Sequence, residues 1–162
     1  MKELIIHPRF LKDHYKGTPR YGLYEEAQRK IKVPLGYNGD IFSVEAYQEI
    51  QEKFPDADSF MYGRGIIARP YLLDEIMCGT RMKKEDRQSQ YKQKMRQFHD
   101  CREYQEYLSG ERNVLFRMKE LWSYMAPGFT NYAKYLKKIK KSQHLGDYEA
   151  AVMSLFGEQE IL

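Results

Sequence analysis

Short apolar runs alternate with helical patterns in the first half of the chain. The runs at residues 4–6, 33–37 and 59–62 predict buried strands, because each is short, apolar and stopped by polar or turn residues. Between them, apolar residues recur at helical spacing over 24–31 and 44–54. Strands that alternate with helices in this way predict βαβ units and a parallel sheet.

Three residues mark the expected helix boundaries. Ser43 is the predicted N-cap of the second helix. Pro55 should end that helix, because the residue before a proline is disfavoured in the helical region. Pro70 suits the first turn of a further helix, which carries the apolar residues of 72–77.

From about Gly79 onward the pattern is helical only. Apolar stripes occur at residues 91–108, 114–125, 132–139 and 148–156, and we interpret them as the core of a helical bundle. The expected fold class is therefore α/β plus all-α. Residues 1–78 form the α/β region and residues 79–162 the helical domain.

Length and composition limit the classes of protein that remain. The chain has 162 residues, of which 42% are hydrophobic and 31% charged, as in globular domains. No apolar run is long enough to span a membrane, and the first residues do not resemble a secretion signal. We expect a cytoplasmic protein without membrane contact. A complete (β/α)₈ barrel takes about 250 residues and does not fit.

The net charge of +4 hides an uneven distribution. Residues 81–141 hold 16 basic and seven acidic side chains, whereas residues 1–80 hold 11 and 12. The acidic tail, 142–162, holds four acids and no lysine or arginine. The basic segment indicates either a polyanion partner, most plausibly nucleic acid, or simply a solvated lysine-rich helical surface.

Two glycine corners carry the candidate chemistry. Residues 38–40 (Asn-Gly-Asp) and 63–65 (Gly-Arg-Gly) each follow an expected strand and precede a helix. In a parallel sheet both corners lie at the carboxyl ends of the strands, where ligands bind. Glycines allow close backbone approach, helix starts favour anions, and Arg64 adds a forked donor suited to phosphate. His7, at the end of the first strand, either reaches the same mouth or serves as a structural donor.

Other catalytic chemistries find no support in the sequence. Cys78 and Cys101 do not make a disulfide framework, and neither has a partner at metal-ligand spacing. Cys101 falls on the apolar face of its expected helix, which favours core packing. No Ser/His/Asp motif, P-loop or Gly-x-Gly-x-x-Gly sequence occurs.

Taken together, these corners resemble the C-terminal part of a tRNA-dihydrouridine synthase. Residues 4–9 (LIIHPR), followed by Tyr-Lys-Gly at 15–17, resemble the family's strand ending in His-x-Arg and its Tyr-x-Gly region. Residues 33–42 (VPLGYNGDIF) and 60–65 (FMYGRG) resemble its last two strands with their corners. Residues 117–124 are similar, more loosely, to a basic aromatic helix of its C-terminal domain. The likeness implies the last three strands of a (β/α)₈ TIM barrel followed by a helical tRNA-binding domain.

The resemblance implies a cofactor, a reaction and a partner. The cofactor would be FMN, with NADPH as electron donor, and the reaction the reduction of uridine to 5,6-dihydrouridine in tRNA. The implied FMN-binding residues are His7, Asn38, Gly39, Asp40, Gly63 and Arg64. The target base must leave its stack to reach such a flavin. The implied tRNA-binding residues are Arg96, Arg117, Lys119, Lys134, Lys137 and Lys138.

The chain also departs from the family pattern. Pro8 stands where the family has glycine, and Phe10-Leu11 replace Thr-Arg. The family's general-acid cysteine and its flavin-contacting lysine belong to earlier strands, so no catalytic residue is assigned. We expect a fragment that is inactive alone and needs a complementing barrel chain, or self-association through open strand edges. The alternatives are a non-catalytic RNA-binding module or partner subunit, and a piece of another FMN barrel such as the dihydroorotate dehydrogenase type.

Overall fold

The computed structural model describes residues 1–13, 16–100 and 110–162, without the side chains of 94–100. It divides into two compact units. The first consists of Met1–Ile66 and Leu72–Gly79, and the second of Ile67–Tyr71 and Thr80–Leu162. A short segment within the first half of the sequence thus belongs to the second unit.

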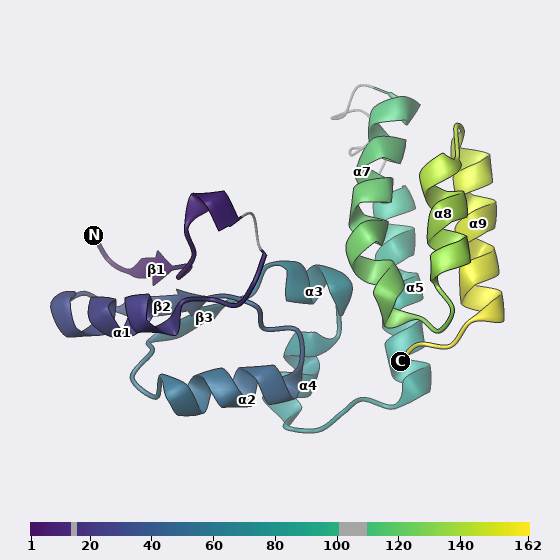
Figure 1. The fold of residues 1–162 in the computed structure, drawn as a ribbon. Coiled ribbons are helices and arrows are strands. Elements are labelled where there is room, and N and C mark those ends of the chain that lie inside the picture. Colours follow the sequence, from purple (N-terminus) through teal and green to yellow (C-terminus); the bar gives the residue numbers. More distant parts are fainter. Residues whose placement is uncertain (14–15, 101–109) are drawn as a thin grey trace. The chain divides into compact units, whose positions relative to one another are not determined.

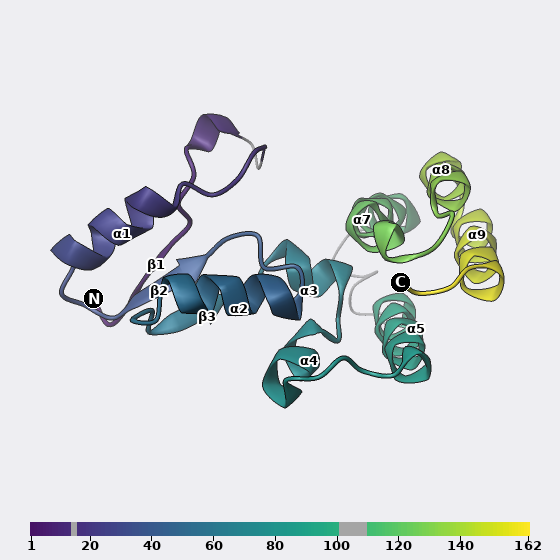
Figure 2. The same ribbon diagram turned by 60° about the horizontal axis from the view of Figure 1, so that its bottom comes forward.

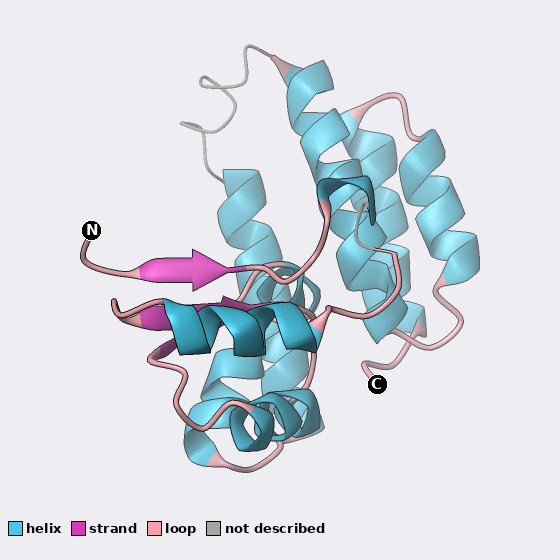
Figure 3. Ribbon diagram, turned by 60° about the vertical axis from the view of Figure 1, so that its left-hand side comes forward, coloured by secondary structure: helices cyan, strands magenta, loops and turns pink. Residues whose placement is uncertain are grey.

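A three-stranded parallel sheet forms the centre of the first unit. Its strands are β1 (Leu4–Ile6), β2 (Leu35–Asn38) and β3 (Ser59–Met61), in the order β1-β2-β3. The connecting helices are α1 (Tyr21–Lys30) and α2 (Val44–Lys53). Both strand pairings are parallel, and Figure 3 shows β1 at one edge of the sheet. The predicted βαβ arrangement is confirmed, and the open sheet is consistent with part of a barrel.

One face of this sheet packs on its helices, and the other face is open. Tyr24 of α1 is fully buried, and its hydroxyl donates to the Leu35 carbonyl at 3.0 Å. Burial raises the pKa of Tyr24 to about 12. On the other face Ile5 and Met61 are 42% and 48% exposed, because alternate residues of a strand point to opposite sides. The core of the first unit consists of Tyr24, Leu35, Tyr37, Ile41, Ile50 and Phe54.

Two of the three predicted helix-boundary residues are confirmed, and one prediction is wrong. The Ser43 hydroxyl accepts a hydrogen bond from the Ala46 amide at 3.1 Å, which confirms the predicted N-cap. Helix α2 ends at Lys53, before Pro55, as expected. The prediction that Pro70 lies in the first turn of a helix is wrong, because α4 (Leu72–Cys78) starts two residues after it. The reason is a short unpredicted helix, α3 (Arg64–Ala68), which leaves Pro70 in the turn that follows it.

Helices make up the second unit. They are α5 (Lys84–Asp100), α7 (Glu111–Met125), α8 (Ala133–Lys141) and α9 (Leu145–Glu158). Figures 1 and 2 show α7, α8 and α9 lying side by side. Among the described residues of this unit, the only strand-like pairing is an isolated antiparallel bridge between Phe129 and Ile161. None of the helices described is both long and apolar enough to cross a membrane.

The described residues of the predicted apolar stripes contribute to the core of the second unit. Trp122 and Tyr148 are fully buried, and the indole Nε1 donates to the tyrosine hydroxyl at 2.7 Å. Burial also raises the pKa of Tyr148 above its ordinary value. The buried stripe residues include Val114, Leu115, Met118, Met125, Tyr135, Ile139, Val152 and Leu155. Cys101, expected in this core, lies outside the described residues.

Two glycines with different surroundings allow the packing of α3 to be tested. A Cβ at Gly65 would overlap the backbone carbonyl of Ile41, whereas one at Gly22 in α1 would meet nothing within 4 Å. We predict that Gly65→Ala lowers the free energy of unfolding by about 1–3 kcal/mol through overpacking. Gly22→Ala, the control in the first turn of α1, should raise it by up to about 1 kcal/mol, because alanine has a higher helix propensity than glycine. Urea denaturation measures both, and an unaltered Gly65→Ala protein would contradict the described packing.

Candidate functional site

The carboxyl ends of the three strands meet at one pocket in the first unit. Its volume is about 220 Å³, and it is lined by His7, residues 38–42 and residues 61–65. His7 follows β1, the second group of residues follows or ends β2, and the third follows or ends β3. All six residues expected to bind a cofactor therefore line a single pocket, although cofactor binding itself stays a prediction.

The backbone of the pocket is shaped by the two corners. Asp40 has a φ of +33°, which is uncommon for a residue other than glycine but most accessible to Asp and Asn. A Cβ at Gly63 would meet nothing within 4 Å, so the main chain there is open to a ligand. Gly65, by contrast, packs closely on Ile41 and fixes the start of α3 against the first corner. Arg64 is thereby placed at the rim of the pocket.

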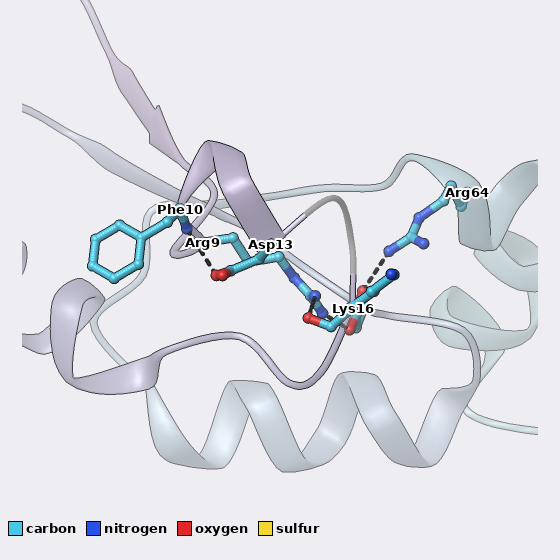
Figure 4. Close-up of polar contacts among 6 residues, drawn as sticks. Arg9, Phe10, Asp13, Lys16 and Arg64 are labelled. Atoms are coloured by element: carbon cyan, nitrogen blue, oxygen red, sulfur yellow. Dashed lines mark hydrogen bonds and ion pairs between the residues drawn. The ribbon is translucent and has the colours of Figure 1, made fainter.

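A carboxylate flanked by two guanidinium groups dominates the electrostatics. Asp40 Oδ1 accepts from Arg64 at 2.7 Å, and Oδ2 pairs with Arg9. The Arg9 side chain is only 4% exposed, and its other terminal nitrogen donates to the Lys16 carbonyl at 2.9 Å. Figure 4 shows these contacts of Arg9 and Arg64 as dashed lines. The cluster has a formal charge of +1, which favours an anion.

His7 lies in this positive surrounding. Burial is the largest cause that lowers the pKa of His7 from 6.5, and the charge of Arg9 lowers it further. Asp40 opposes the shift, and Arg64 adds to it. The ring is therefore held neutral near physiological pH, in a form that both donates and accepts hydrogen bonds.

Arg9 takes part in the ion-pair cluster of this site, although the sequence did not assign it. It belongs to the His-Pro-Arg run, but no spacing rule indicates that it pairs with a residue 31 positions away. Aromatic side chains also border the pocket. Phe42 lies beneath the Arg64 guanidinium, 5.5 Å from its ring centroid, and Tyr62 lines the wall.

The basic residues expected to contact tRNA are spread over the second unit. On α7, Arg117 pairs with Glu120 at 2.9 Å, and Lys119 bonds to the Ser142 carbonyl. Helix α8 carries Lys134, Lys137 and Lys138, all exposed.

Two of these six residues give less support to the expected tRNA contact. Lys134 lies 3.8 Å from Glu158, so part of its charge is neutralised within the unit. The side chain of Arg96 lies outside the described residues. The structure thus brings three of the six together on one helix, and RNA contact remains a prediction for all six.

The donor set of the pocket suits a phosphate group. Arg64 supplies a forked guanidinium, which matches phosphate oxygens, and Gly63 leaves the neighbouring main chain accessible. The volume is below the roughly 300–1,000 Å³ of pockets that enclose a whole ligand of drug size. The pocket therefore fits the phosphate end of a larger ligand better than the entire molecule.

Comparisons with known proteins agree with the motifs in the sequence. A family model described as dihydrouridine synthase matches residues 1–157. The tRNA-dihydrouridine(16) synthase of Pseudomonas syringae pv. tomato is 34% identical over 79 residues, which are 49% of this chain and 25% of that protein. The tRNA-dihydrouridine synthase B of Shewanella oneidensis is 32% identical over 73 residues, which are 45% and 22%. The matched region is thus at most about a quarter of the length of these relatives.

The lowered pKa of His7 predicts how stability changes with pH. The unfolded chain binds the proton more readily than the folded chain, so the contribution of neutral His7 is complete above the unfolded pKa of 6.5. This contribution is lost as the pH falls from 6.5 toward the lower pKa that His7 has in the folded chain. Between about pH 7 and pH 5, wild type should lose more free energy of unfolding than His7→Gln. Equal losses in urea denaturation, or an NMR titration of His7 at or above its midpoint in the unfolded chain, would contradict this.

Proposed function

The chain belongs to the dihydrouridine synthase family, and on that basis we propose that it is the C-terminal portion of a flavin-dependent tRNA-dihydrouridine synthase. The whole enzyme would reduce uridine to 5,6-dihydrouridine in tRNA, with NADPH as electron donor and FMN as carrier. The observation that carries the proposal is the convergence of both corners and His7 on one pocket, with the Arg64 guanidinium among its lining groups.

The pocket is proposed to hold the phosphate end of FMN. Arg64 would bind the phosphate oxygens, and the open backbone at Gly63 would lie against them. Asn38, Gly39 and Asp40 would lie along the cofactor, with His7 approaching from β1. When bound, FMN supplies the two-electron chemistry that the amino-acid side chains lack.

Full activity would require more of the barrel than the three strands here. Strands β1 and β3 are the edges of the sheet, and its uncovered face exposes Ile5 and Met61. Unpaired edges invite pairing with further strands. We propose that a complementing barrel polypeptide, or self-association, covers them. Without it the chain is inactive, because the family's general-acid cysteine and flavin-contacting lysine belong to strands outside these 162 residues.

The second unit is proposed to bind tRNA. Its support is the excess of basic over acidic side chains in residues 81–141 and the exposed lysines of α8. Such binding would act through phosphates and RNA shape, and would weaken with salt.

A non-catalytic RNA-binding module, or a partner subunit, is the second candidate. Two observations favour it: neither Cys78 nor Cys101 stands in a Cys-Pro loop, and the basic segment belongs to the second unit whereas the pocket residues belong to the first. It differs from the first candidate in taking up no flavin.

A comparison of FMN with riboflavin tests the proposal, because riboflavin lacks only the phosphate. We predict that the chain binds FMN more tightly than riboflavin, as measured by flavin fluorescence. Arg64→Ala should weaken FMN binding about tenfold or more, since hydrogen bonds to charged groups contribute about 1.5–3 kcal/mol. Riboflavin affinity should hardly change.

Arg29→Ala is the matched control for charge, because Arg29 is exposed on α1 and lines a different pocket. It should leave both affinities unaltered. If the chain shows no preference for FMN, the phosphate corner is wrong and the RNA-binding candidate becomes the better one.

A further inference from the structure

A single carboxylate links the ends of all three strands. Asp40, after β2, accepts from Arg64, after β3, with one oxygen, and it pairs with Arg9, after β1, with the other. Asp40 thus connects two arginines that are distant from it in the sequence, Arg9 by 31 positions and Arg64 by 24. Phe42, two residues after Asp40, adds a further contact to Arg64.

A carboxylate in this place is unexpected if its own role is to bind phosphate. Its negative charge repels an anion and competes for the Arg64 guanidinium, which lies 2.7 Å away. Two opposite roles therefore remain for Asp40. It either weakens anion binding as a competitor, or strengthens it by holding the guanidinium in place.

The geometry favours the second role. A guanidinium has five donors in a rigid fork, and the bond from Nη2 to Asp40 uses one of them while restraining the group. The Arg64 side chain is long and 27% exposed, so unsupported it would lose rotamer freedom when a ligand binds. A contact made before binding lowers that cost.

Arg9 supplies the countercharge that this role requires. Its side chain is almost wholly buried and does not line the pocket. Pairing with Arg9 offsets the Asp40 carboxylate, so the cluster keeps the net positive charge of Arg64 for a ligand. Without Arg9, Asp40 and Arg64 would sum to zero.

We propose that Asp40 is a positioning residue that orients Arg64 toward a phosphate group, with Arg9 as its buried countercharge. This inference rests on the proposed function for the identity of that phosphate as the flavin's. The chemistry that it describes applies equally to inorganic phosphate, which serves as the probe.

The test is a titration of the 162-residue chain with inorganic phosphate at constant ionic strength, followed through the NMR amide signals of residues 63–65. Asp40→Asn removes the charge but suits the positive φ of this position. Charge alone predicts tighter phosphate binding by this variant. The positioning role predicts weaker binding, by roughly fivefold or more. Asp56→Asn, an exposed position at the other end of the strands, is the control and should match wild type.

Asp40→Glu separates geometry from charge, because it keeps the carboxylate but moves it. Weaker phosphate binding by this variant also supports positioning, and unchanged binding opposes it. If wild type binds phosphate and Asp40→Asn binds it as well or better, the inference is overturned while the phosphate corner stands. If phosphate leaves the wild-type signals unmoved, the corner itself is wrong, and the inference and the proposed function fall together.

Discussion

The ion pairs of Asp40 are the constraint on which the site depends. They join the carboxyl ends of the three strands, and this is the edge of a parallel sheet at which ligands bind. The close packing of Gly65 on Ile41 serves the same purpose, since it sets the start of α3 and with it the position of Arg64. Charge and packing together turn two separate glycine corners into one pocket.

The sequence was sufficient for the features that local rules control. Strands and helices followed from apolar periodicity, and Ser43 capped α2 because a hydroxyl before a helix satisfies a free amide. The glycine corners were recognised because ligand sites recur at such positions. The family resemblance that these corners carry then implied six of the residues that line the pocket.

What the sequence did not show depends on contacts between distant positions. The pairing of Arg9 with Asp40 follows from how β1 and β2 align, and no motif encodes it. Helix α3 was missed because Gly-Arg-Gly reads as a turn, and its presence moved the start of α4 past Pro70. The open face of the sheet, with Ile5 and Met61 exposed, likewise becomes visible only in three dimensions.

We propose above that this chain holds the phosphate end of a flavin site but not the whole reaction centre. The direct measurement is mass spectrometry of dihydrouridine in tRNA after incubation with the purified chain, FMN and NADPH. The complete tRNA-dihydrouridine(16) synthase of Pseudomonas syringae pv. tomato, of which the match covers 25%, serves as the positive control. We predict no dihydrouridine from the 162-residue chain alone. Full turnover by that chain would contradict the account.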